Sequence, residues 1–490
     1  MNSDLVSISK LEVGIGGFDD IAVGGVPKGR TTLVTGSTGT AKTVFCCQFL
    51  AEGIRKYNQN GVFVTFEERP DDIRANTHSF GWDIEEWERN KAWAFVDVSQ
   101  QSQETIVSGP FDLDALIARI SHAVEQVGAQ RVALDSLAAV FARFNNHAII
   151  RVELFRIVSA LREIGVTTIM TAERDSEYGP VARYSIEEFV ADNVIILRNV
   201  LQGERRRRTM EILKFRGAFH HKGEYPFAII PNEGIEVIPL SSLKLQQLSN
   251  DVRITSGNQI LDQMCNGGFF RDSVVMVSGA TGTGKTLLST TFIAGGAEQG
   301  ERSLMFAFEE SPQQIFRNAN GWGIDFEERE QGDLIRLECV YPETAGLEGH
   351  LIRMKAIIEE YQPKRVVVDS ISALRRISSR ESFREFMIAF TSFIKHKQIA
   401  GLYTTTATSL LGSDVVTEAH VSTITDSIIL LRYIEHRGAV MRGITVLKMR
   451  GSIHDQRIRE FTIGSDGIHI REPLETISGI LTGNVMYERG

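Results

Sequence analysis

The sequence has few cysteines, no long apolar run and no excess of basic residues. Its four cysteines, Cys46, Cys47, Cys265 and Cys339, lack the spacing of a disulfide framework or a metal site, so we predict buried free thiols. No segment approaches the ~18 uncharged apolar residues of a membrane-spanning helix, and the first ten residues lack the apolar stretch of a secretory signal. These absences predict a cytoplasmic protein with no membrane segment.

The charge balance is acidic, with a formal net charge of −9 and an isoelectric point near 5.8. General nucleic-acid binding depends on basic surface, which displaces counterions from phosphates. The run Arg205–Arg208 is a local basic cluster that we interpret as facing another subunit or solvent. We therefore expect no nucleic-acid partner.

The length of 490 residues exceeds what one compact core can hold, because single cores stop growing near ~250–300 residues. The sequence is also an internal repeat. GSTGTAKT at 36–43 returns as GATGTGKT at 279–286, and the segments VFVTFEE, RVALDS, DNVIILR and LKFRG return in the same order as LMFAFEE, RVVVDS, DSIILLR and LKMRG. The polar stretch 241–251 matches neither copy. We predict a first domain over 1–245 and a second over 246–490.

Each copy alternates two kinds of segment. Apolar, β-rich runs such as TTLVTG, GVFVTFEE, RVALDS and TTIMTAE are separated by segments with helical spacing, as at 112–128 and 148–164. This pattern predicts an α/β fold with a mainly parallel sheet flanked by helices, and with the glycine-rich loops it indicates two tandem RecA-like P-loop NTPase domains. The later runs DNVIILR and RRTMEILKFRG are predicted to be antiparallel additions at one edge.

The glycine-rich segments predict ATP binding. The second one satisfies G-x-x-x-x-G-K-[ST] between a predicted strand and a predicted helix, as that motif requires. Its backbone N–H groups would surround the phosphates, Lys285 would reach the β and γ oxygens, and Thr286 would ligate Mg²⁺. The predicted ATP-binding residues of the two loops are Gly36, Ser37, Thr38, Gly39, Thr40, Ala41, Lys42 and Thr43, and Gly279, Ala280, Thr281, Gly282, Thr283, Gly284, Lys285 and Thr286.

The first loop departs from the motif at one position, where Ala41 replaces the second glycine. If this position has a positive φ, alanine costs roughly 1–2 kcal/mol, and if it is helical, alanine is harmless. We predict that ATP binding is retained but weakened in the first domain.

Carboxylates end several of the apolar runs. Asp135 and Asp369 close predicted strands, where the ligand crevice of an open α/β sheet lies, and we predict that they join Thr43 and Thr286 in holding Mg²⁺. The alternative is a helix cap, because a serine follows each aspartate.

Two glutamate pairs, Glu67-Glu68 and Glu309-Glu310, also end strands. They are candidate bases for a water or a hydroxyl nucleophile, and Glu309 is also a candidate magnesium ligand. The alternative is a helix start, since Pro70 and Pro312 follow closely.

Long segments of both halves resemble the circadian clock protein KaiC family. They include GFDDIAVGGVPKGR, RYSIEEFVADNVIILRNVLQGERRRRTMEILKFRG and HHKGEYPF in the first half, and GATGTGKTLLST, STITDSIILL and VLKMRGSIHD in the second. The resemblance covers nearly the whole chain. It implies ATP and Mg²⁺ as cofactors and a double-ringed homo-hexamer with ATP at the subunit interfaces.

In such a ring, the neighbouring subunit completes each ATP site. The matching positions are Lys214, Arg216, His220 and Lys222 for the first ring, and Lys448, Arg450 and His454 for the second. Basic residues after a strand suit a triphosphate, although an ordinary solvated edge is the alternative.

The resemblance implies that the first ring mainly hydrolyses ATP, while the second is a serine/threonine autokinase and autophosphatase. The phosphorylated positions read Ser422 and Thr423, and the first copy has Glu188 and Phe189 there. In this interpretation Glu309 takes the hydroxyl proton, and Lys285, Mg²⁺, Lys448 and Arg450 stabilise the transferring phosphoryl group.

The resemblance implies a KaiB-like partner for the first ring, in a circadian clock or a related timing or stress response. Family members continue past an Ile-Ser-Gly segment into a tail that docks KaiA, whereas this sequence stops soon after Ile477, Ser478 and Gly479, so we expect no KaiA-like partner. Two other hypotheses stay open. One is a RecA-like DNA-dependent ATPase on the same scaffold, and the other is a nucleotide-gated hexameric scaffold without kinase activity.

Overall fold

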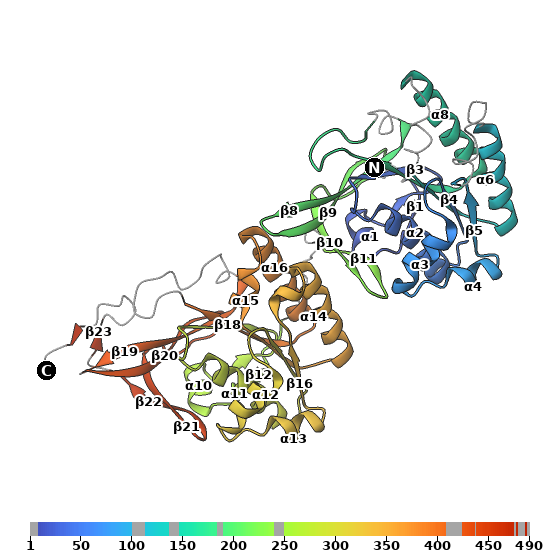
Figure 1. Cartoon of the computed structure of the whole chain (residues 1–490). Coiled ribbons are helices and arrows are strands. Elements are labelled where there is room, and N and C mark those ends of the chain that lie inside the picture. Colours follow the sequence, from blue (N-terminus) through green and yellow to red (C-terminus); the bar gives the residue numbers. More distant parts are fainter. Residues whose placement is uncertain are drawn as a thin grey trace, which may run out of the picture. The chain divides into compact units, whose positions relative to one another are not determined.

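A computed structural model describes residues 8–99, 113–136, 147–183, 190–239, 249–407, 424–436, 438–474, 477–478 and 486–487. The chain divides into two compact units, Met1–Ser242 and Leu243–Gly490 (Figure 1). Each unit has its own sheet and its own core.

The first unit is built on a nine-stranded sheet with the order β11-β10-β9-β8-β3-β7-β6-β4-β5. The strands from β8 to β5 pair in parallel, and β9, β10 and β11 extend the sheet in antiparallel fashion. Their bounds are β3 (Thr31–Gly36), β4 (Gly61–Thr65), β5 (Trp93–Asp97), β6 (Arg131–Asp135), β7 (Thr167–Glu173), β8 (Asn193–Gln202), β9 (Arg205–Phe215), β10 (Glu224–Ile230) and β11 (Gly234–Val237). A short pair, β1 (Lys10–Leu11) and β2 (Val26–Pro27), lies outside this sheet.

Helices cover both faces of this sheet. Successive side chains of a strand point to opposite faces, and on β3 Leu33 packs in one core cluster with α6 and α8, while Val34 packs in another with α2. Both faces are therefore buried, which explains the near-continuous apolar runs (Figure 1). The helices are α1 (Phe18–Ile21), α2 (Lys42–Tyr57), α3 (Pro70–Thr77), α4 (Ile84–Arg89), α6 (Leu113–Val127) and α8 (His147–Ile164).

The second unit repeats the architecture with the order β16-β15-β17-β18-β14-β19-β20-β21-β22. Its strands are β14 (Val274–Gly279), β15 (Ser303–Ala307), β16 (Ile335–Cys339), β17 (Arg365–Asp369), β18 (Ala400–Thr406), β19 (Ser427–His436), β20 (Ala439–Met449), β21 (Arg459–Gly464) and β22 (Gly467–Pro473). Two further short pairs are β12 (Arg253–Ile254) with β13 (Phe269–Phe270), and β23 (Ile477–Ser478) with β24 (Met486–Tyr487). The helices are α10 (Gln259–Met264), α11 (Lys285–Ala297), α12 (Pro312–Asn320), α13 (Phe326–Gln331), α14 (Leu347–Tyr361), α15 (Ile371–Arg376) and α16 (Arg380–His396).

The predicted fold class, a mainly parallel sheet flanked by helices in each copy, is confirmed. One strand direction was predicted wrongly. The run DNVIILR forms the start of β8, which pairs in parallel with β3, and the antiparallel extension begins only at β9. The first seven residues of β8 are buried, because β8 is an inner strand between β3 and β9 rather than an edge addition.

The cysteines agree with the prediction of free thiols. Cys46, Cys47 and Cys265 are buried, and Cys339 is half-buried. Among the described residues, no helix combines the length and the apolar character needed to cross a bilayer.

Candidate functional site

The first phosphate loop, residues 36–43, connects the carboxyl end of β3 to the start of α2. The Lys42 ammonium donates hydrogen bonds to the carbonyl oxygens of Gly36 and Ser37, at 2.9 and 3.1 Å, and partial burial lowers its pKa. The Thr43 hydroxyl donates to Asp135 Oδ2 at 2.5 Å. The loop opens on a pocket of about 280 Å³ that is lined by Thr38, Gly39, Ala41, Lys42, Thr43, Val44, Thr65, Glu67, Glu68, Asp135, Ser136 and Glu173.

The second phosphate loop, residues 279–286, has the same arrangement between β14 and α11. The Lys285 ammonium donates to the carbonyl oxygens of Gly279 and Ala280, at 2.8 and 2.9 Å. Asp369 accepts hydrogen bonds from the hydroxyls of Thr286 and Thr404, and burial raises its pKa. Asp369 thus bonds across strands to the loop, whereas the cap of the following helix is Ser370, whose side chain makes no capping bond.

These side chains fit a magnesium ion. Mg²⁺ prefers oxygen ligands and is usually held by one or two protein groups together with phosphates and water. Each loop offers a threonine hydroxyl beside an aspartate carboxylate, Thr43 with Asp135 and Thr286 with Asp369. In the described part of the chain, no group of three or more histidine, cysteine or acidic side chains is arranged so that it could hold a metal ion by itself.

The glutamate pairs lie beyond the ends of β4 and β15, and neither pair caps a helix. The first turn of α3 has Asp71 and Asp72 as its acidic residues, and α12 is capped by Ser311. Within each pair the two carboxylates differ. Glu67 accepts from the Ser136 hydroxyl at 2.9 Å, and Glu309 accepts from the Arg376 guanidinium at 2.6 Å.

The second glutamate of each pair has a raised pKa. Partial removal from solvent, together with the nearby charge of Asp135, raises the pKa of Glu68. Burial and the charge of Asp369 raise the pKa of Glu310 in the same way. A carboxylate with a raised pKa is a better proton acceptor, which favours Glu68 and Glu310 as bases, while Glu67 and Glu309 remain the candidates predicted from the sequence.

Ala41 has a positive φ of 75°, and the corresponding Gly284 has a φ of 103°. The position therefore requires the left-handed conformation, and the alanine is strained there. The sequence left open whether this position has a positive φ or is helical, and the structure shows the positive φ, for which alanine is unfavourable.

Ala41→Gly is expected to raise the free energy of unfolding of the first domain by about 1 kcal/mol, because the strain disappears and part of the gain is lost to the freer unfolded glycine. The matched variant Gly284→Ala should destabilise the second domain, since an added Cβ would also lie 3.2 Å from Ile463 Cδ1. Hydrogen exchange of the full chain, resolved by domain, would measure both. No gain from Ala41→Gly would contradict the strain.

The predicted donor lysines lie on inner strands of the two sheets, away from the phosphate loop of the same chain. Lys214 pairs with Val194, which pairs with Leu33, three residues before the loop begins at Gly36. Lys448 pairs with Ile428 and through it with Met276, three residues before Gly279. Each lysine is thus two strands across and roughly 10 Å back along the strand from the loop. The structure does not bring these residues together in one copy.

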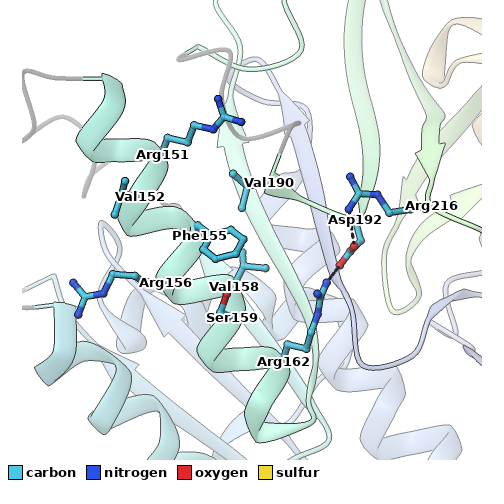
Figure 2. Close-up of a pocket in the computed structure, with 10 residues that line it drawn as sticks. All are labelled: Arg151, Val152, Phe155, Arg156, Val158, Ser159, Arg162, Val190, Asp192 and Arg216. Carbon is cyan, nitrogen blue, oxygen red and sulfur yellow. Dashed lines mark hydrogen bonds and ion pairs between the residues drawn. The ribbon is translucent and has the colours of Figure 1, made fainter.

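Several of these donors are held near the amino ends of β8 and β19. The ammonium groups of Lys214 and Lys448 donate to the carbonyl oxygens of Ala191 and Thr425, both at 3.0 Å. Figure 2 shows two arginines approaching the Asp192 carboxylate, Arg162 from α8 and Arg216 from the turn after β9. Arg162 forms an ion pair with this carboxylate, and the Arg216 guanidinium lies 3.6 Å from it. They border a pocket of about 420 Å³ whose other lining residues are Arg151, Val152, Phe155, Arg156, Val158, Ser159 and Val190.

The histidines of this segment have buried ring nitrogens without a partner in the described part of the chain. They are Nδ1 of His220 and both ring nitrogens of His454. Burial lowers the pKa of His220. Buried polar atoms normally have partners, so these nitrogens are exceptions within the described part of the chain.

The predicted phosphorylation residues, Ser422 and Thr423, lie outside the described residues. Sequence reasoning missed several side chains that act on the sites. Thr171 and Thr404 bond to the strand-end aspartates, Arg376 holds Glu309, and Glu177 bonds to the first loop. The two threonines occupy the same place in TTIMTAE and AGLYTTT, so a comparison of the two repeats could have identified them.

Two sheets, each with a lysine, a threonine and a strand-end aspartate gathered at a glycine-rich loop, define a tandem P-loop ATPase. The family model described as "ATPase: KaiC" matches residues 11–242 and again residues 254–475. The chain belongs to the KaiC family of ATPases. Its two repeats are RecA-like domains, and it is an ATP-hydrolysing enzyme by family.

The relatives include named clock proteins. The chain is 59% identical over 481 residues to circadian clock protein KaiC3 of Synechocystis sp., covering 98% of this chain and 95% of that protein. It is 52% identical over 476 residues to circadian clock oscillator protein KaiC of Thermostichus vulcanus, with 97% and 92% covered. It is 50% identical over 483 residues to the KaiC of Synechococcus elongatus, with 99% and 93% covered.

Proposed function

We propose that this protein is a KaiC-type ATPase, serine/threonine autokinase and autophosphatase that acts in a circadian clock or a related timing or stress response. The observation that supports the proposal most is the position of the basic donors. In both units the lysines Lys214 and Lys448 lie two strands across the sheet from the phosphate loop of the same chain and back along the strand from it. A single copy therefore holds the two halves of a site, the loop and the donor lysines, apart from one another.

A ring of identical copies would complete these halves, because each copy would present its donors to the loop of the next. We therefore propose a homo-hexamer with ATP at the subunit interfaces. A KaiB-like protein is the partner proposed for the first ring.

At the second site, the proposed reaction moves the γ-phosphoryl group of ATP to the hydroxyl oxygen of Ser422 or Thr423, with ADP leaving. Glu309, held by Arg376, takes the hydroxyl proton. Lys285 orients the phosphates, and Lys448 and Arg450 of the neighbouring copy stabilise the charge that develops. Mg²⁺, when bound at Thr286 and Asp369, neutralises phosphate charge. At the first site, Glu67 and Glu68 orient water, so that the outcome is hydrolysis.

Phosphosite mapping by mass spectrometry after incubation with Mg-ATP tests this proposal. Phosphate is expected on Ser422 or Thr423 of the wild type, and Glu309→Gln should reduce its rate of appearance roughly a hundredfold or more, because general bases contribute ~10²–10⁴-fold. Glu310→Gln is the matched comparison, since it removes the neighbouring carboxylate.

Other outcomes would support the competing hypotheses. ATP hydrolysis with no modified residue would contradict the autokinase and leave a ring ATPase or a scaffold. Turnover stimulated by DNA would support a DNA-dependent ATPase instead.

A further inference from the structure

We propose that Glu177 is a positioning residue for the first ATP site, where it braces the first phosphate loop from outside and offsets the strain at Ala41. The brace consists of Glu177, Asn199 and Ser37. The proposal rests on the first domain binding and hydrolysing ATP, and it adds a residue that the motif does not contain.

The Glu177 carboxylate joins two elements. One oxygen accepts a hydrogen bond from the Ser37 hydroxyl, and the other accepts from the backbone N–H of Asn199 on β8 at 3.0 Å. The Asn199 side-chain amide donates to the carbonyl oxygen of Gly39, at 3.4 Å, and Arg208 Nε lies 3.5 Å from the same oxygen. The second and fourth residues of the loop are therefore tied to the neighbouring strands.

The segment that carries Glu177 is itself anchored. The buried guanidinium of Arg174 donates to the carbonyl oxygens of Pro180 and Gly179, at 3.0 and 2.9 Å. The buried Arg198 donates to the carbonyl oxygen of Glu177 at 3.2 Å, and it forms an ion pair with Glu211 at 2.5 Å. Glu177 can restrain the loop only if its own backbone is held in place, and these hydrogen bonds hold it.

The first loop needs such support more than the second. Ala41 is held at a φ of 75°, which an alanine adopts only when its surroundings impose it. Gly284 adopts the same region without strain. At the position of Ser37 the second loop has Ala280, which has no hydroxyl, so this brace cannot form there.

The brace acts on the loop and not on the substrate. The residues that line the pocket include Thr38, Gly39 and Lys42, but not Ser37, Glu177 or Asn199. Loss of the brace should therefore weaken the binding of phosphates by the loop while leaving the groups that perform hydrolysis in place. The expected signature is a change in KM for ATP without a change in kcat.

The test uses the full chain with Glu309→Gln and Glu310→Gln, so that ATP hydrolysis reports the first site. In this background Glu177→Ala and Ser37→Ala should each raise the KM for ATP roughly tenfold, as expected for the loss of a hydrogen bond to a charged group, with kcat within about twofold. Glu177→Gln keeps an oxygen acceptor, so its KM for ATP should lie between the KM of these two variants and that of the unaltered chain.

The link to Ala41 is tested by combining variants. In an Ala41→Gly chain the loop no longer needs support, so Glu177→Ala should raise KM only about two- to threefold, which is a non-additive effect between coupled sites. If Glu177→Ala raised KM equally in the Ala41 chain and in the Ala41→Gly chain, the proposal that Glu177 offsets the strain at Ala41 would be wrong.

The remaining outcomes separate the brace from the function on which it rests. An unchanged KM in both Glu177→Ala and Ser37→Ala would overturn the brace, as would a large fall in kcat, which would assign Glu177 to the chemistry. No ATP hydrolysis in the unaltered background would overturn hydrolysis at the first site itself. Ser37→Ala guards against misfolding, because alanine already occupies the matching position of the second loop.

Discussion

Lys285→Met is expected to abolish autophosphorylation and to weaken ATP binding at the second site by roughly a hundredfold or more, because truncating one partner of a buried charge pair costs ~2–5 kcal/mol. The Lys285 side chain is buried, and its ammonium is held at the mouth of the loop by the carbonyl oxygens of Gly279 and Ala280. Methionine keeps much of the volume but removes two hydrogen bonds to the loop and leaves the phosphates without a cation.

The repeat supplies a matched variant. Lys42 makes the corresponding bonds to Gly36 and Ser37, so Lys42→Met should remove nucleotide from the first site and spare the second. Lys397, at the end of α16, forms an ion pair with Glu359 at 3.0 Å and belongs to neither loop, so Lys397→Met is the control for loss of a surface lysine. Nucleotide occupancy measured by mass spectrometry, with phosphosite mapping, would follow both sites. Loss of both occupancies in either loop variant would contradict independent sites.

Arg365→Met is expected to destabilise the second domain by about 3–5 kcal/mol, the usual cost of breaking a buried ion pair from one side. The Arg365 guanidinium is fully buried and bonds to Glu301 at 2.8 Å. It also donates to the carbonyl oxygens of Thr255 and Phe292, at 2.8 and 3.0 Å. Its removal leaves a partly buried carboxylate with Arg271 alone and breaks the hydrogen bonds to two carbonyl oxygens.

The first domain offers a comparison, because its buried arginine has an amide rather than a carboxylate as this acceptor. Arg131 is equally buried, but Gln59 stands where the second copy has Glu301, and it accepts from Arg131 at 2.8 Å. Burial lowers the pKa of Arg131 to about 10. Because no carboxylate is left unpaired, Arg131→Met should cost less, about 2–3 kcal/mol from the lost hydrogen bonds.

Chemical denaturation of the full chain, followed by hydrogen exchange in each domain, would measure both arginine variants. Adding Glu301→Gln to Arg365→Met should recover part of the lost free energy, since it removes the stranded charge. A cost for Arg131→Met that equals or exceeds that for Arg365→Met would contradict this account.

Much of the architecture was predictable from local patterns. The strands that carry the phosphate loops and the strand-end aspartates were predicted because buried parallel strands leave short apolar runs, and TTLVTG is β3 and RVALD is β6 in the structure. The helices predicted at 112–128 and 148–164 are α6 (Leu113–Val127) and α8 (His147–Ile164), where helical spacing of apolar residues marks the buried face.

Features that depend on distant partners were not predictable in this way. The direction of β8 follows from its pairing with β3, more than 150 residues earlier in the chain, and an apolar run is compatible with either direction. The sign of φ at Ala41 followed from the turn into α2, which the residue type alone left open. Glu177 reaches Ser37 only because β7 and β3 are neighbours in the sheet.

The sequence alone therefore determined the class of fold, the repeat, and the lysines, threonines and aspartates of both sites, because spacing within a strand–loop–helix unit is local. The tertiary structure decided where Lys214 and Lys448 lie relative to the loops, which carboxylate of each glutamate pair has a raised pKa, and what supports the first loop. These depend on burial and on strand pairing, which arise only when segments distant in sequence pack together.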